Sequence, residues 1–344
     1  MTTAASGAHD EPCVELVHGS GGRATHRLVE ELFLAAFGNP TLHARNDGAV
    51  LPPIPGRLVV STDMHVVSPL FFPGGDIGSL AVNGTINDVA MTGARPLYLT
   101  AGFVLEAGLP LADLARIASS MATAAGAAGV TIVAGDTKVV EPGKADRLFI
   151  STTGVGVLAD GVELGADRAR PGDRLLLSGS LGEHATAILA GRMQLDLEAR
   201  VVSDCAALHE LVAALLAAAP HLRCLRDPTR GGLGATLNEL AHQSRVGMVL
   251  DETAIPVTEE VRAICELLGF DPLYLANEGK LVAVCPPEEA DAALASLRAH
   301  PLGRRAAAIG EVVPDPHGFV ELRTAFGGRR VLDWLAGDQL PRIC

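Results

Sequence analysis

Hydrophobic positions follow two different periods along this chain, and the two periods predict a mixture of helices and strands. Apolar residues at helical spacing predict helices over residues 24–37, 111–125 and 233–244, and a further helix that begins after Asp76 and carries Asn87 and Asp88. Asp76 is predicted to be its N-cap. Apolar and β-branched runs predict strands over residues 57–61, 98–106, 130–133, 148–158, 174–178 and 281–285. This mixed order predicts an α/β (α+β) protein.

The length of 344 residues, with 48% hydrophobic residues, is enough for about two domains that each have a core. A junction at residues 169–173 separates the predicted strands into two groups. We expect an N-terminal lead and helix over residues 1–45, a first domain over 46–165, a second domain over 166–336 and a mobile tail over 337–344.

A net charge of −13 argues against nucleic acid as the main partner. The first eleven residues lack the basic and apolar regions of a signal peptide, and the longest apolar runs, such as residues 211–219, are far shorter than a membrane span. We therefore expect a cytoplasmic protein that does not bind membranes.

Six cysteines are spaced without any pattern typical of zinc or iron–sulfur sites. Cys265 and Cys285 lie in apolar runs and are expected in the core. Cys344 is different, because it ends the chain on a thiol that a flexible tail could present to other proteins. The sequence leaves two interpretations open, a carrier of a covalently attached group or an ordinary chain end.

Two glycine-rich stretches precede predicted helices. The first contains Gly19, Ser20, Gly21 and Gly22, and the second places Arg230 before two glycines. Backbone N–H groups at a helix start favour anions, so each stretch could bind phosphates, or each could be an ordinary helix start. No Walker A or Rossmann glycine pattern occurs, so a nucleotide would bind without either motif.

Acidic residues recur where strands end, where turns occur or among apolar residues. Asp88 lies within an apolar helix and would be costly without a cation or hydrogen-bond donors nearby. Hard oxygen ligands of this kind suit Mg²⁺ that holds a polyphosphate, although single aspartates after strands are often turn residues. Glu278, before a glycine, could be a base in a tight turn or a solvated turn residue. The predicted metal ligands are Asp47, Asp63, Asp88 and Asp136.

Taken together, these motifs resemble those of the HypE family, the carbamoyl dehydratases of nickel–iron hydrogenase maturation, within the aminoimidazole ribonucleotide synthetase-like superfamily. The resemblance covers almost the whole chain. One departure is Asn46, which stands where related enzymes often carry a second acidic residue. The matching stretches are residues 18–22, 61–63, 69–78, 87–88, 135–140, 227–232 and 276–280 and the terminal Pro341-Arg342-Ile343-Cys344.

The resemblance implies a two-domain PurM-like fold with a flexible C-terminal tail. Its first domain is expected to bind ATP and Mg²⁺ and to pair with a second copy in a homodimer. The expected partners are a HypF carbamoyltransferase, which places a carboxamide on Cys344, and the HypC–HypD iron-carrying complex.

The implied reaction is ATP-dependent dehydration of that S-carboxamide to an S-cyanide, the source of the cyanide ligand of the hydrogenase iron. Cys344 is the carrier, Glu278 the candidate base, and Lys138 the group that neutralises charge on the transferred phosphoryl group. The nucleotide is expected to contact Gly19, Ser20, Gly21, Gly22, Asn87, Thr137 and Arg230.

Two alternatives remain at this point. A selenophosphate synthetase-like enzyme of the same superfamily would carry its reactive residue near the N-terminal glycine-rich stretch, where Cys13 lies five residues before His18. A non-catalytic cyanide carrier would need the tail, but it would have no use for the acidic motifs.

Overall fold

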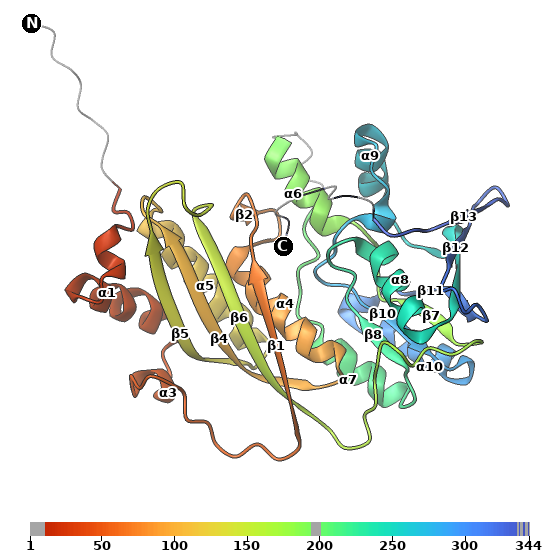
Figure 1. The fold of residues 1–344 in the computed structure, drawn as a ribbon, viewed down its shortest axis with the longest axis horizontal. Helices are drawn as coiled ribbons and strands as arrows, with labels where there is room; N and C mark the ends of the chain where they lie inside the picture. Colours follow the sequence, from red (N-terminus) through yellow and green to blue (C-terminus); the bar gives the residue numbers. More distant parts are fainter. Residues whose placement is uncertain (1–10, 194–200, 336, 338–339, 341–342, 344) are drawn as a thin grey trace, which may run out of the picture.

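Two β-sheets with helices packed against them make up the fold of the computed structural model, which describes residues 11–193, 201–335, 337, 340 and 343 (Figure 1). The N-terminal half forms the smaller sheet and the C-terminal half forms the larger one. β6 ends at Leu158 and β7 begins at Arg174, so the connection between the sheets contains the predicted junction. The domain boundaries at residues 45, 165 and 336 stay predictions.

The smaller sheet has four strands in the order β1-β6-β4-β5, and all its neighbours are antiparallel except β4 and β5. Helices α4 and α5 cover one face, and the other face is open (Figure 1). The bounds are β1 (Arg57–His65), β4 (Arg95–Glu106), β5 (Thr131–Val140), β6 (Leu148–Leu158), α4 (Ile77–Met91) and α5 (Leu111–Ala127). The short β2 (Phe71–Phe72) and β3 (Gly75–Asp76) form a separate ladder.

The start of α4 confirms the predicted N-cap. One carboxylate oxygen of Asp76 accepts hydrogen bonds from the backbone N–H groups of Gly78 at 2.8 Å and Ser79 at 2.9 Å. These bonds satisfy donors that have no partner within the helix. Asn87 and Asp88 lie on this helix, as predicted.

Two predicted strand ends are wrong. Asp63 lies within β1, and Gly135, Asp136, Thr137 and Lys138 lie within β5 rather than after a strand. The glycine and aspartate are turn-forming types, but β4 pairs with β5 throughout, with Gly102 opposite Asp136 and Val104 opposite Lys138. Ladder hydrogen bonds from a neighbouring strand therefore override the local preference for a turn.

The N-terminal helix predicted over residues 24–37 is present in three parts. α1 (Arg23–Leu28) continues through a π-helical segment (Val29–Leu34) into α2 (Ala35–Phe37), and α3 (Pro40–His43) follows. Phe33 and Phe37 pack with Phe103 of β4, which attaches the helix to the sheet.

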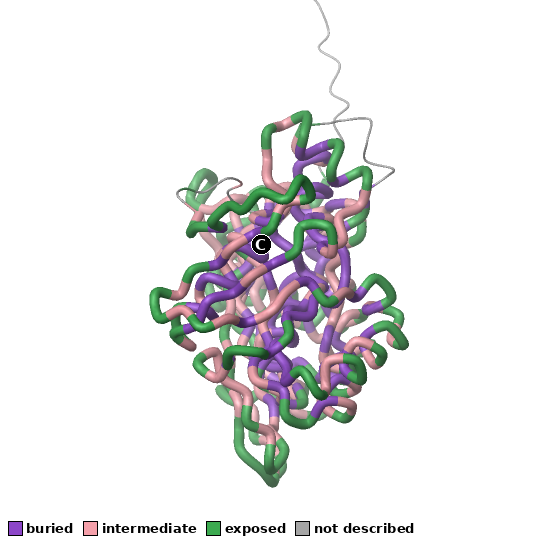
Figure 2. The backbone as a smooth tube through the Cα atoms, turned by 90° about the vertical axis from the view of Figure 1, so that its right-hand side faces the viewer, coloured by how far each residue is buried: buried purple, intermediate pink, exposed green. Residues whose placement is uncertain are grey.

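The larger sheet has seven strands in the order β13-β12-β9-β11-β7-β10-β8. Leu175 and Leu177 of β7 belong to an apolar cluster with α8, whereas Leu176 belongs to the cluster with α7 and α10, so both faces of this sheet are covered. Figure 2 shows buried backbone through the middle of the molecule. The bounds are β7 (Arg174–Leu177), β8 (Cys224–Arg226), β9 (Gly247–Asp251), β10 (Val282–Cys285), β11 (Ala307–Val313), β12 (Val320–Arg323), β13 (Arg329–Val331), α7 (His209–Ala218), α8 (Gly232–Ser244) and α10 (Ala290–Ala299).

Helices α6 (Glu183–Met193) and α9 (Glu259–Leu268) contribute to the apolar cluster of the smaller sheet. Ile343, near the end of the chain, is only 5% exposed and belongs to the same cluster. Cys265 and Cys285 are buried, which confirms their predicted place in the core. Among the described helices, none has the length and apolar character to cross a membrane.

Candidate functional site

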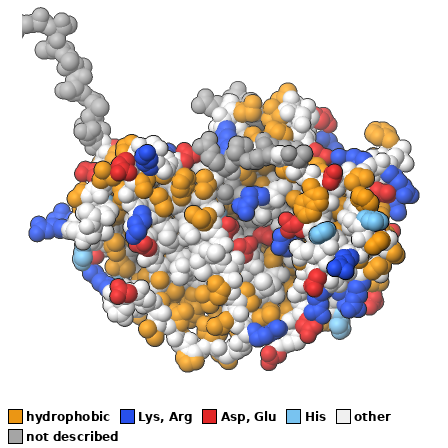
Figure 3. Space-filling view, viewed as in Figure 1, with side chains coloured by type: hydrophobic (Ala, Val, Ile, Leu, Met, Phe, Trp, Pro, Cys, Tyr) orange, Lys and Arg blue, Asp and Glu red, His pale blue; other side chains and the backbone are white. Residues whose placement is uncertain are grey.

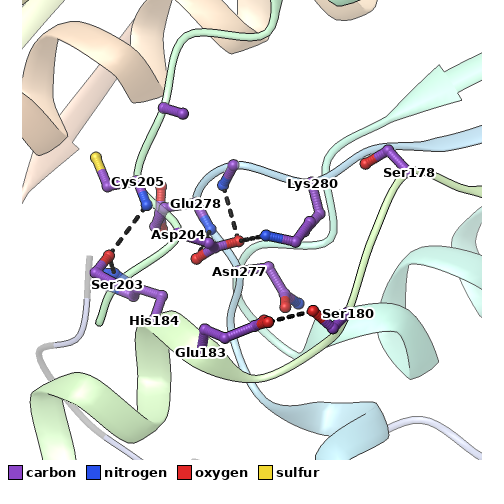
Figure 4. A network of polar contacts seen from close by, with 12 residues as sticks. Ser178, Ser180, Glu183, His184, Ser203, Asp204, Cys205, Asn277, Glu278 and Lys280 are labelled. Carbon is purple, nitrogen blue, oxygen red and sulfur yellow. Dashed lines mark hydrogen bonds and ion pairs between the residues drawn. The ribbon is translucent and has the colours of Figure 1, made fainter. Parts of the chain in front are cut away.

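A loop of four residues before β10, from Asn277 to Lys280, carries the predicted base Glu278 (Figure 4). Asp204 holds this loop, because its carboxylate accepts hydrogen bonds from the backbone N–H groups of Glu278 and Gly279, both at 3.1 Å. The same carboxylate pairs with the Lys280 ammonium at 3.0 Å, and both side chains are largely buried. One aspartate therefore fixes three consecutive residues.

Glycine is needed at position 279, because a Cβ atom there would lie 1.8 Å from the carbonyl oxygen of Asp204. Asn277 fastens the other end of the loop. Its amide donates to the carbonyls of Pro228 at 2.9 Å and Leu275 at 3.0 Å, and its oxygen accepts from the Gly182 N–H at 2.8 Å. The loop is thus rigid before any ligand arrives.

Glu278 itself is only 4% exposed, and its Oε1 atom has no hydrogen-bond partner among the described residues. Burial and, secondarily, the negative charges of Asp204 and Asp227 raise the pKa of Glu278 well above its usual value. A carboxylate with a raised pKa is a stronger base than a solvated one. The side chain is therefore not a solvated turn residue, and its role as a base stays a prediction.

Asn87 forms hydrogen bonds in the interior of the site. Its amide donates to the carbonyls of Ala206 at 3.0 Å and Glu278 at 3.2 Å, and its oxygen accepts from the Leu208 N–H at 2.7 Å. These contacts connect α4 to the loop of Glu278. Asn87 therefore holds this part of the site together, and its predicted contact with a nucleotide stays a prediction.

A second group of acids lies where β1 and α4 meet the larger sheet. Ser61 donates a hydrogen bond to Asp88 at 2.9 Å, but burial and the charge of Asp63 raise the pKa of Asp88. Burial and the neighbouring Asp88 also raise the pKa of Asp227 to about 7. Crowded carboxylates of this kind favour a cation. Figure 3 shows acidic and basic side chains near the centre of this face, and the positive charge of Arg230 acts on Asp88.

Asp136 lies elsewhere on the smaller sheet. It pairs with Lys138 at 2.9 Å, and both side chains are 70% exposed. Across the paired strands, Asp136 of β5 is aligned with Met64 of β1. Asp63 of β1 is instead aligned with the buried Thr152 of β6. Because neighbours in register point to the same face, Asp63 and Asp136 project from opposite faces, and three strand spacings separate their strands by roughly 14 Å.

Gly21 of the glycine-rich stretch and Asp47 line one pocket of about 410 Å³, together with Thr25, Arg45 and Gly135. A smaller apolar pocket beside it is lined by Phe33, Phe103, Asp136 and Thr137, among others. The two pockets share Gly135.

Within the glycine-rich stretch, local contacts already use several polar groups. Ser20 Oγ donates to the Val17 carbonyl at 2.8 Å, and the Gly21 N–H donates to Thr25 Oγ1 at 3.0 Å. Gly22 is the N-cap of α1, and a Cβ at Gly19 would lie 2.9 Å from the side chain of Val139. The stretch therefore packs on β5 as well as lining the pocket.

The four predicted metal ligands thus fall at three places within one chain. Asp63 and Asp88 are neighbours, whereas Asp47 and Asp136 lie apart from them, and the described residues contain no group of three or more potential ligands arranged for a metal ion. Cys344 lies outside the described residues. The roles predicted for all these residues stay predictions.

The sequence motifs do not contain Asp204 or His184, both of which belong to the network around Glu278 (Figure 4). Asp204 lies in an irregular segment and His184 on an ordinary helix, so no local signal marks them. Asp227 could have been found, because it stands beside Arg226 in the stretch that precedes α8.

Comparisons with known proteins agree with this architecture. Two family models match, AIR synthase related protein, N-terminal domain, over residues 45–158, and its C-terminal domain over residues 170–323. The chain is 66% identical to carbamoyl dehydratase HypE of Azotobacter vinelandii over 331 residues, which are 96% of this chain and 97% of that protein.

Two solved structures are also similar. The hydrogenase maturation protein HypE in complex with ATP is 52% identical, with a TM-score of 0.92, over 96% of this chain and 99% of that one. HypE in a HypE–HypF complex is 45% identical, with a TM-score of 0.78, over 90% of this chain and 99% of that one. The fold is therefore the two-domain PurM-like fold that the sequence predicts.

Proposed function

This chain belongs to the carbamoyl dehydratase HypE family, and from that premise we propose that it uses ATP to dehydrate an S-carboxamide on Cys344 to an S-cyanide. The observation that supports the proposal is a series of contacts that leads from residue 343 to the loop of the candidate base. The Ile343 carbonyl is hydrogen bonded to His184, whose other ring nitrogen contacts Ser203. Ser203 is adjacent to Asp204, which holds the backbone of Glu278.

The reaction removes the oxygen of the carboxamide and two protons from its nitrogen. When bound, Mg–ATP supplies the phosphoryl group that turns the carboxamide oxygen into a phosphate leaving group. One nitrogen proton is released to solvent when the oxygen is phosphorylated. Glu278 accepts the other as the carbon–oxygen bond breaks and a carbon–nitrogen triple bond forms. The products are the S-cyanide, ADP and phosphate. The raised pKa of Glu278 suits it to this proton transfer.

Residues beside the smaller sheet fit a metal-bound nucleotide. The pocket lined by Gly21, Arg45 and Asp47 is within the size range of small-molecule sites, and Arg45 carries the charge that a polyphosphate requires. The apolar pocket beside it, with Phe33 and Phe103, suits a nucleotide base. Asp47 lines the same pocket and would provide an oxygen ligand for Mg²⁺ there. Asp63 and Asp88 lie apart from this pocket in one chain and would hold a cation of their own, as their crowding favours one.

A homodimer would explain the exposed face of the smaller sheet. Leu58, Val60 and Met64 alternate along β1 and are between 59% and 65% exposed. A row of large apolar side chains on an open sheet favours association. We propose that the open faces of two copies pack together and that this pairing brings Asp136 and Lys138 of one copy toward the nucleotide of the other.

The partners follow from the family. A relative forms a complex with HypF, and we propose that a HypF-type carbamoyltransferase loads Cys344 of this chain. The S-cyanide would then pass to an iron-carrying complex of the HypC–HypD type. A tail that must meet two partners and an internal base has to dock reversibly.

Intact-mass measurement tests this function directly. We expect incubation with the carbamoyltransferase, carbamoyl phosphate and ATP to give a carboxamide adduct, which then loses one water when the protein binds Mg–ATP. Cys344→Ala should give no adduct, while its melting temperature and ATP binding stay unchanged, because a terminal residue adds little packing. An adduct on the Ala variant would contradict the assignment of Cys344 as the carrier.

A further inference from the structure

His184 contacts the backbone of residue 343 through its side chain. It lies in the first turn of α6 and is fully buried, and its Nε2 atom is 2.8 Å from the Ile343 carbonyl oxygen, 159 residues away in sequence. Its ring meets Phe72 edge-on, with 5.5 Å between ring centroids. The ring is therefore fixed by packing as well as by hydrogen bonds.

The hydrogen-bond partners define the tautomer of His184. A carbonyl oxygen can only accept, so Nε2 carries the proton that is donated to Ile343. Nδ1 then accepts from the hydroxyl of Ser203 at 2.8 Å, and the Ser203 oxygen accepts from the Cys205 N–H at 3.1 Å. Burial lowers the pKa of His184, which agrees with a neutral ring that has one proton.

Only the tail satisfies the Nε2–H donor among the contacts of the described residues. If the tail were displaced, this donor would be buried without a partner unless water replaced the carbonyl, and that state is unfavourable. The Ile343 side chain adds apolar contacts, because it belongs to the same buried cluster as Phe72, Ala187 and Val201. The site thus binds residue 343 by its side chain and by its backbone.

We propose that His184 is a positioning residue that holds the tail by the Ile343 carbonyl and so presents Cys344 to Glu278. The peptide group is planar, so fixing this carbonyl also fixes the Cα atom of the next residue. Only the rotations about N–Cα and Cα–Cβ of Cys344 then determine where its sulfur lies. This inference rests on the proposed dehydratase function.

A hydrogen bond to the backbone of the tail has a chemical advantage at this position. The Ile343 carbonyl is the same whether the Cys344 sulfur carries a proton, a carboxamide or a cyanide. His184 can therefore hold the tail in the same position whether Cys344 carries the substrate or the product group. The anchor and the base are also joined directly, because Ser203 and Asp204 are consecutive, and Asp204 holds the Glu278 backbone (Figure 4).

The test compares His184→Leu, which removes the donor at similar size, with His184→Gln, which retains an amide N–H. The first readout is the rate at which iodoacetamide alkylates Cys344, followed by mass spectrometry of the C-terminal peptide. The second is single-turnover dehydration of protein that has already been carbamoylated. For His184→Leu we expect about tenfold faster alkylation and about tenfold slower dehydration, as for the loss of one hydrogen bond.

His184→Gln should stay within about threefold of the wild type in both readouts, because its N–H can replace the imidazole donor. A role in folding alone would not produce this rescue or a change specific to Cys344. Carbamoylation by the carbamoyltransferase should not slow in either variant. His209→Leu is the matched control, since His209 is a half-buried histidine on α7, and it should leave both rates unchanged.

If His184→Leu does not fold, Ser203→Ala replaces it, because this change removes the donor to Nδ1 and leaves the ring in place. It should move both rates in the same directions by about threefold. Wild-type rates in a folded His184→Leu protein, or in Ser203→Ala when His184→Leu fails to fold, would overturn the proposal. Alkylation needs no catalysis, so it decides the role of His184 even if the wild type forms no cyanide.

Discussion

We propose roles in the reaction for both the loop of Glu278 and the exposed pair on β5, Asp136 and Lys138. The two regions differ in how far the single chain buries them and fixes them with hydrogen bonds. Around Glu278, Asp204 and Asn277 satisfy the backbone with hydrogen bonds of 2.8–3.1 Å, and nearly every group is buried. Asp136 and Lys138 face solvent and contact each other. The first region is preorganised, whereas we propose that the second is completed by a nucleotide or by another copy of the chain.

This difference agrees with the roles that we propose for the two regions. A base must be held and shielded from water so that its pKa stays high. Groups that bind a polyphosphate must remain accessible until the nucleotide arrives. Exposed ion pairs such as Asp136–Lys138 are weak and can exchange partners at little cost.

The largest effect is expected at the preorganised region. Glu278→Gln keeps the size and the backbone contacts of the residue but removes the proton acceptor. Dehydration should slow by about 10²- to 10⁴-fold, while carbamoylation of Cys344 and ATP binding should not change. Single-turnover mass spectrometry of the carbamoylated protein measures this. A rate within threefold of the wild type would mean that another group takes the proton.

A smaller effect is expected at the acidic group between the two regions. Asp88→Asn replaces a carboxylate with a poorer ligand, so the Mg²⁺ concentration that supports half-maximal ATP turnover should rise by about 10- to 100-fold.

Asp76→Asn is the matched control on the same helix. Its side-chain oxygen can still accept from Gly78 and Ser79, so the cap should persist and the Mg²⁺ titration should not move. Equal titrations for Asp88→Asn and the wild type would remove Asp88 from the metal site.

The proposed role of the exposed pair on β5 can be tested by disrupting the dimer that we propose. Val60 is 65% exposed on β1, and Val60→Glu should weaken association by about 2 kcal/mol or more if the side chain is buried between copies. Sedimentation measures the dimer, and ATP turnover should fall with it. Leu267→Glu on α9, which is 69% exposed at a different surface, should change neither. A monomeric wild type would rule out the shared site.

The smallest expected effect is a change in the stability of the fold caused by Glu183, a buried carboxyl near the loop of Glu278. Burial raises the pKa of Glu183, whose Oε2 atom has no partner among the described residues. The folded state therefore retains a proton that the unfolded chain releases, so this group stabilises the fold at low pH and loses that contribution as the pH rises above 4.5 and through the raised pKa.

Glu183→Gln should remove this pH dependence. Its melting temperature should exceed that of the wild type at pH 8 by about 2 °C, and the difference should shrink toward pH 4. The exposed Glu163→Gln serves as the control. A constant difference across this range would show that the proton on Glu183 does not affect stability.

Local signals predicted most of the elements. Residues 148–158 form a strand with the predicted bounds, and α4 begins at the predicted cap, because side-chain alternation and capping depend on residues close in sequence. The motifs also placed Glu278 in a tight turn that requires glycine at position 279. The family followed from the order of these motifs along the chain.

Tertiary contacts decided how the site is assembled. The sequence placed Asp63 and Asp136 in one acidic set, but strand order puts them on opposite edges and faces of the sheet. Asp204 meets Glu278 across 74 residues, and His184 meets Ile343 across 159. Spacing along the chain carries no information about such partners, because they are set by how sheets and helices pack. The sequence by itself therefore determined most of the elements and the motifs, and only the tertiary structure decided which side chains meet.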